Sequence, residues 1–152
     1  MQSRIIRMRK LVELADIDLD KAAQTLAALQ AESTSSEEQL SSLTDYIAEL
    51  SEKISVQKKE ITAIDLQSQR GFSDKLYQAI EAQTEKVTRL KEVLEKGREE
   101  WLEKRMRKES LLALLNKLKQ KHQAEQDKRE QRMLDELATQ RVIANKSQIS
   151  NK

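Results

Sequence analysis

Residues 40–54 read LSSLTDYIAELSEKI, and apolar side chains recur in this stretch at spacings of three and four residues in alternation. The repeat extends in both directions, and fifteen of the eighteen positions that it selects are apolar. A straight helix would rotate such a stripe away from its neighbour, so the repeat predicts a helix supercoiled around a partner helix. The positions are Ile5, Met8, Val12, Ala15, Leu19, Ala22, Leu26, Leu29, Ser33, Ser36, Leu40, Leu43, Ile47, Leu50, Ile54, Gln57, Ile61 and Ile64.

The composition also points to long helices. Of 152 residues, 36% are charged, while two are Gly and none is Pro or Cys, so little is available for turns. Ala, Glu, Lys, Gln and Leu favour helix over strand. On an open coiled coil no carboxylate is buried enough for acid–base catalysis, there is no Gly-rich phosphate loop, and the single His122 lacks fellow metal ligands. We therefore expect no enzyme, no cofactor and no metal site.

A second heptad run follows one possible reversal of the chain. Gly71 can end a helix and Ser73 can cap the next one, so the sequence predicts helix one at about 3–67, a turn at about 68–73 and helix two at about 74–141. Residues 1–141 then form a single hairpin, and 142–152 a flexible polar tail. The second run comprises Leu76, Ile80, Gln83, Val87, Leu90, Leu94, Gly97, Trp101, Lys104, Lys108, Leu111, Leu115 and Leu118.

Folding the chain at this turn pairs the two seams so that residue numbers add to 140 or 141. The polar seam positions then meet each other, and polar pairs in a seam fix its register. In this register Gly97 makes room for Trp101. The polar pairs are Ser33 with Lys108, Ser36 with Lys104 and Gln57 with Gln83, and among the apolar pairs are Leu26 with Leu115, Leu40 with Trp101, Ile61 with Ile80 and Ile64 with Leu76.

Beyond Leu118 the second arm becomes polar while the first stays apolar. The strip around Met8 and Val12 is then covered by another protein or frays, unless a stutter brings Met133 and Leu137 back to the seam. Basic residues gather at this end, which suggests docking to an acidic surface, or else a solvated face with ion pairs to Glu125, Asp127 and Glu130. They are Arg4, Arg7, Arg9, Lys10, Lys117, Lys119, Lys121, Lys128, Arg129 and Arg132.

Aromatic side chains lie at the edge of the seam near the expected turn. Tyr46 belongs to the series Gln39, Leu43, Tyr46, Leu50, and Phe72 to the series Phe72, Leu76, Ala79, Gln83. Two interpretations remain open. The rings anchor a partner protein, because aromatic side chains bury a large area at small entropic cost, or they cover the flank of the seam.

Several motifs occur together in a particular order. A basic N-terminus with Leu11-Val-Glu-Leu is followed by Gln39-Leu-x-x-Leu-x-Asp-Tyr46, Phe72-x-x-x-Leu76-x-x-Ala79, Trp101-x-x-Lys-Arg and Met133-x-Asp-Glu136-x-Ala138. In order, spacing and length the chain resembles the family of the flagellar export protein FliJ. The resemblance covers nearly the whole chain.

The resemblance implies a central stalk of the flagellar type III export apparatus. Such a stalk binds and stimulates the hexameric export ATPase, links it to the membrane protein of the export gate, and handles export chaperones. The implied ring contact is Arg4, Arg7, Met8, Arg9, Lys10 and Val12. The implied gate contact is Gln39, Leu43, Tyr46, Leu50, Phe72, Leu76, Ala79 and Gln83, with Leu50 and Gln83 standing where Tyr and His are expected.

We accordingly expect a cytoplasmic protein, monomeric on its own and peripherally associated with the inner-membrane export apparatus. No apolar run is long enough for membrane insertion, and the interleaved charges disfavour nucleic acid. Three alternatives stay open: the equivalent stalk of a virulence-type secretion system, a structural coiled coil that dimerises through residues 8–19, and a nucleic-acid-binding rod.

Overall fold

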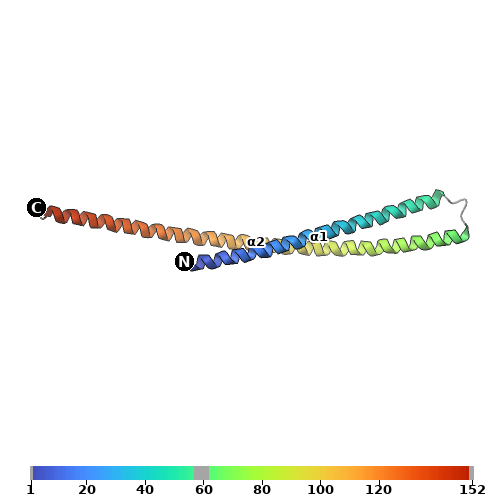
Figure 1. The fold of residues 1–152 in the computed structure, drawn as a ribbon, viewed down its shortest axis with the longest axis horizontal. Helices are drawn as coiled ribbons and strands as arrows, with labels where there is room; N and C mark the ends of the chain where they lie inside the picture. Colours follow the sequence, from blue (N-terminus) through green and yellow to red (C-terminus); the bar gives the residue numbers. More distant parts are fainter. Residues whose placement is uncertain (1, 57–61, 151–152) are drawn as a thin grey trace. The chain divides into compact units, whose positions relative to one another are not determined.

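The computed structural model describes residues 2–56 and 62–150. Two long helices, α1 (Gln2–Val56) and α2 (Ala63–Ser150), pack against each other as an antiparallel hairpin (Figure 1). The predicted all-helical fold is therefore confirmed.

The chain divides into two compact units, each containing part of both helices. The terminal unit comprises Met1–Ile17 and Arg105–Lys152, and the central unit comprises Asp18–Lys104. The terminal unit contains 16 basic and 8 acidic residues and therefore has a net charge of +8. The central unit has 12 basic and 18 acidic residues, a net charge of −6. The small net charge of the whole chain thus conceals two units of opposite sign.

Burial follows the heptad positions along both helices. In α1 every predicted seam position from Ile5 to Ile54 is buried or half-buried, and in α2 the same holds from Leu76 to Leu118. Ile5 and Leu115 are the buried apolar residues nearest the chain ends, and Val87 lies in the central unit. The predicted seam positions Gln57 and Ile61 lie outside the described residues.

The predicted turn at 68–73 is wrong, because these residues lie inside α2. Thr62 caps the start of α2: the backbone N–H of Asp65 donates to Thr62 Oγ1 (3.3 Å), and that of Leu66 donates to the Thr62 carbonyl (3.0 Å). A Thr followed by an acid three residues later is an ordinary signature of a helix N-terminus. The Thr hydroxyl accepts a hydrogen bond from a backbone N–H of the first turn, and glycine has no side chain that could do so. Gly71 instead sits on an exposed helical face, with open space where a Cβ would be.

Both expected ends of the second helix also need correction. α2 begins with Ala63, so Ile64 belongs to α2, where it is exposed rather than in the seam of helix one. At the other end the expected flexible tail from residue 142 is helical through Ser150. No Gly or Pro interrupts this stretch, so nothing in the local sequence ends the helix.

The predicted register of the two helices is wrong as well. The amide of Gln83 reaches Ser36, Gly97 lies against Leu26 and Leu29, and Lys108 pairs with Asp16. The numbers of these pairs add to between 119 and 126 instead of 140 or 141. A seam with a seven-residue repeat looks the same after a shift of whole heptads, so periodicity alone does not distinguish these registers. Consequently Ser33 with Lys108, Ser36 with Lys104, Leu26 with Leu115 and Leu40 with Trp101 are not the pairs that form.

Gly97 has a different neighbour from the one expected. A Cβ at this position would lie 3.0 Å from Leu29 Cδ1 and 3.7 Å from Leu26 Cδ1. The missing side chain therefore makes room for leucines of α1 rather than for Trp101. Close approach of the two helices at this point compensates for the unfavourable helix propensity of Gly.

Candidate functional site

In the central unit a polar contact joins α1 and α2 within the seam. Gln83 Nε2 donates to the backbone carbonyl of Ser36 (2.9 Å) and to Gln39 Oε1 (3.3 Å). Ser36 is only 2% exposed, and its small side chain lets the amide of Gln83 approach the α1 backbone. A satisfied polar group in an apolar seam fixes register at little cost in stability.

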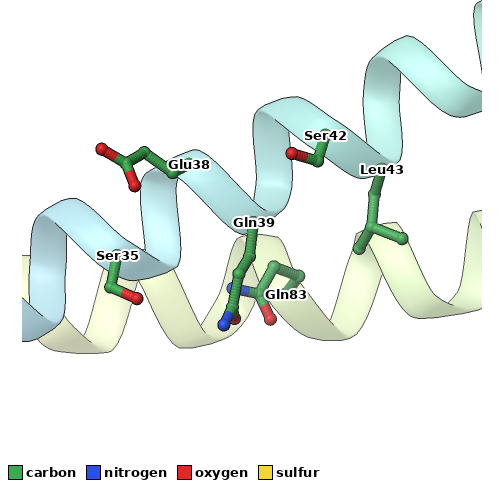
Figure 2. A pocket seen from close by; sticks show the side chains of 6 residues that line it. All are labelled: Ser35, Glu38, Gln39, Ser42, Leu43 and Gln83. Carbon is green, nitrogen blue, oxygen red and sulfur yellow. The ribbon is translucent and has the colours of Figure 1, made fainter.

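An open groove of about 570 Å³ lies beside this contact. Figure 2 shows Gln39 and Gln83 next to each other between the helices, with Glu38 pointing away from α2. The groove thus offers hydroxyl, amide and carboxylate groups around an aliphatic side chain, a combination suited to a side chain of a partner protein. Its lining residues are Ser35, Glu38, Gln39, Ser42, Leu43 and Gln83.

Tyr46 of α1 and Phe72 of α2 pack edge to face, with ring centroids 6.4 Å apart and ring planes at 84°. The two residues remain 46% and 45% exposed. They therefore cover the flank of the seam and still present aromatic surface to solvent. Half-exposed aromatic rings held by each other are well suited as anchors for a partner, because little freedom remains to be lost on binding.

The eight residues of the predicted gate contact all lie in the central unit. Gln39, Leu43 and Gln83 line the groove, and Tyr46 contacts Phe72. Of the remaining three, Leu50 and Leu76 are half-buried in the seam and Ala79 is exposed. Five of the eight residues, drawn from both helices, therefore lie either in the lining of the groove or in the aromatic pair.

The predicted ring contact lies in the terminal unit. Its basic residues Arg4, Arg7, Arg9 and Lys10 are exposed, whereas Met8 and Val12 are half-buried seam residues. The expected unpaired strip is not found. Ile5 and Ala15, at 8% and 4% exposed, are among the best-buried residues of the chain, because the actual register brings the apolar part of α2 opposite them.

Asp16 and Lys108 form a close ion pair within the terminal unit, with Nζ and Oδ1 2.6 Å apart. Lys108 is a seam position, so its ammonium group reaches the edge of the seam to meet Asp16 on the other helix. Within the described residues, the basic side chains from Lys117 to Arg132 form no ion pair. Asp127 instead accepts a hydrogen bond from Gln123 (3.0 Å). The bases of this stretch outnumber its acids by six to three, so the stretch carries a net positive charge.

The outer face of α1 carries apolar side chains that seam analysis passed over. Four of them lie among the basic residues of the first five turns and are at least 43% exposed. Their signal in the sequence is a second set of apolar residues, out of phase with the heptads. They are Ile6, Leu11, Leu14 and Ile17.

A second feature missed from the sequence is the end of α2. In the terminal unit α2 continues past the first residue of α1 (Figure 1), and every described residue from Gln126 to Ile149 is exposed. Met133 and Leu137, which a stutter would have returned to the seam, are 66% and 57% exposed. The stutter is therefore not present.

Other kinds of site are not evident in the parts of the chain that the structure describes. No group of His, Asp or Glu residues there is arranged to hold a metal ion. Neither helix, over those same residues, contains a stretch long and apolar enough to cross a membrane.

Comparison with known proteins gave one family. The search of curated proteins and the search of solved structures produced no match. A family model described as flagellar FliJ protein matches residues 3–147, nearly the whole chain. The chain therefore belongs to the flagellar FliJ family, whose members are non-enzymatic structural components of the flagellar export apparatus.

Proposed function

We propose that this protein is the central stalk of the flagellar type III export apparatus, binding and stimulating the hexameric export ATPase and linking it to the export gate. One observation carries the proposal. The residues that the resemblance implies for the gate contact come from two segments of the chain, and five of them lie at the groove or in the Tyr46–Phe72 pair. Family membership supplies the apparatus in which such a surface would act.

The gate contact would combine a half-exposed aromatic pair with a polar groove. Tyr46 and Phe72 would supply apolar area, while Gln39 and Glu38 would set orientation through hydrogen bonds. Gln83 is already held by Ser36 and Gln39, so its main role would be to fix the groove rather than to touch the partner.

The ring contact would use the exposed cations of α1, Arg4, Arg7, Arg9 and Lys10. Because Met8 and Val12 are half-buried in the seam, we propose that the apolar part of this contact is supplied by the outer residues Ile6, Leu14 and Ile17. The terminal unit has a net charge of +8, which would attract an acidic ring lining at long range.

We also propose a cytoplasmic location at the inner-membrane export apparatus and a role in handling export chaperones. Binding to a purified chaperone, measured by calorimetry with and without the ATPase, tests the second role. A chaperone that does not bind under either condition removes it.

The experiment for the whole proposal is the rate of ATP hydrolysis by the cognate export ATPase, with and without this protein, over a range of salt concentrations. Stimulation that declines with salt is the expected result, because screening weakens contacts between exposed charges. A general structural coiled coil would leave hydrolysis unchanged. A nucleic-acid-binding rod would instead show a steeply salt-dependent affinity for DNA.

A further inference from the structure

The last turns of α2, residues 130–149, are exposed to solvent along their whole length. We call them the free segment, a name that refers only to this exposure. All are exposed, including six large apolar side chains. An isolated helix of this length is marginal in water, and so much unpartnered apolar surface favours association. The six are Met133 (66% exposed), Leu134 (62%), Leu137 (57%), Val142 (53%), Ile143 (62%) and Ile149 (76%).

The free segment differs in charge from the rest of the terminal unit. It contains three acids, Glu130, Asp135 and Glu136, and three bases, Arg132, Arg141 and Lys146, so its net charge is zero. The remainder of the unit has 13 basic and 5 acidic residues and therefore carries its entire net charge of +8. Two copies of the positively charged remainder repel each other, whereas two copies of the neutral free segment can approach without this repulsion.

Apolar side chains of the free segment are spaced symmetrically about Ala138, and the two halves on either side of Ala138 carry opposite net charges. Leu134 and Val142 lie four residues before and after it, and with Ala138 they share one helical face. Before Ala138 lie the acids Glu130, Asp135 and Glu136 and one base, Arg132, so residues 130–137 carry a net charge of −2. After it lie the bases Arg141 and Lys146, so residues 139–149 carry a net charge of +2. A second copy running antiparallel would set the acidic half of each segment beside the basic half of the other. Parallel pairing would set acid beside acid and base beside base.

From this symmetry we propose that the free segment pairs antiparallel with the same segment of a second copy, with Ala138 at the two-fold axis. Leu134 and Val142 of each copy pack around the small Ala138, which permits close approach of the helices. With Ala138 on the axis, Glu130 lies level with the partner's Lys146 and Asp135 lies level with the partner's Arg141. This proposal is an alternative to the predicted monomer, and it does not depend on the gate or ring contacts.

The absence of cysteine makes the register of such a pair measurable in the full-length chain. Ala138→Cys places one thiol at the axis, where it meets its own copy within disulfide range. The matched control is Gln140→Cys, an exposed position two residues further on and on the opposite helical face. Under mild oxidation at micromolar concentration, Ala138→Cys is expected to form a cross-linked dimer at least ten times faster than Gln140→Cys. Equal rates would overturn the proposed face.

Charge reversal tests the antiparallel orientation. A basic variant, Glu130→Lys with Asp135→Lys, and an acidic variant, Arg141→Glu with Lys146→Glu, should each sediment as a monomer, whereas an equimolar mixture forms a heterodimer. The unmodified chain should show dimer increasing with concentration. A monomer at every concentration, or a mixture that does not associate, contradicts the proposal. Circular dichroism of each variant checks helicity, and ATPase stimulation measured separately distinguishes failure of this interface from failure of the stalk function.

Discussion

The side-chain amide of Gln83 in α2 donates to the backbone carbonyl of Ser36 in α1 across 2.9 Å. Two residues separated by 47 positions in the chain are thereby fixed opposite each other in a seam that is otherwise largely aliphatic. The contact selects one register among those that differ by whole heptads, because a shift of seven residues would move the amide of Gln83 away from the Ser36 carbonyl.

Removal of this amide should lower stability. Gln83→Ala is expected to cost about 1 kcal/mol, the usual net value of one intramolecular hydrogen bond. Thermal unfolding followed by circular dichroism measures the loss. The control is Gln78→Ala, an exposed change on the same helix, which should leave the melting temperature nearly unchanged. Equal melting temperatures for the two variants would show that the contact contributes no stability.

The two glycines should respond in opposite ways to the same change. Gly71 faces open space, so Gly71→Ala is expected to stabilise the hairpin by about 0.5–1 kcal/mol through helix propensity. Gly97→Ala brings a Cβ to 3.0 Å from Leu29 Cδ1, so the resulting strain should cancel that gain or exceed it. Equal stabilisation by both changes, measured by urea denaturation, would mean that the helices do not approach closely at Gly97.

The position of the chain reversal can be tested through the helix cap. Thr62→Ala removes the acceptor for the Asp65 N–H and should destabilise the protein by about 1 kcal/mol. Ser73→Ala changes the residue that would cap a helix if the turn were at 68–73, but it lies within α2, so a smaller effect is expected. The opposite ranking in denaturant titrations would favour the later turn.

Loss of the aromatic pair should separate binding from stability. Tyr46→Ala with Phe72→Ala removes two half-exposed rings, so helicity should persist while affinity for the export gate decreases at least tenfold. Tyr77→Ala is the matched control, because Tyr77 is 57% exposed on α2 and lies outside the predicted gate contact. Calorimetry with the gate protein provides the comparison, and an equal loss of affinity in the control would remove the specific role of the pair.

Much of the fold could be predicted from the sequence, because burial repeats with the heptads: the predicted seam positions from Ile5 to Ile54 and from Leu76 to Leu118 are all at least half-buried. The register could not, since a seven-residue repeat is unchanged by a shift of seven. Thr62 with Asp65 is the sequence signal for the start of α2, whereas Gly71 suggests a later turn. A turn at Gly71 shifts the reversal of the chain and leaves Met8 and Val12 without partners on the second helix.

The proposed gate contact could also be predicted only in part. The types and spacings of Gln39, Leu43, Tyr46 and Phe72 are visible in the sequence, but their association depends on the register. The opposite charges of the two units depend on which stretches of α1 and α2 pack together, so they emerge only with the structure.

The most direct measurement of the stalk function is the rate of ATP hydrolysis by the cognate export ATPase at increasing concentrations of this protein, with a charge-reversed variant alongside. The unmodified chain should stimulate hydrolysis, and Arg7→Glu with Arg9→Glu should weaken stimulation at low salt. A reversal of two exposed bases in the central unit, Lys86→Glu with Lys96→Glu, should leave it intact. Hydrolysis that stays unchanged at every concentration of the unmodified protein would contradict the proposed stalk.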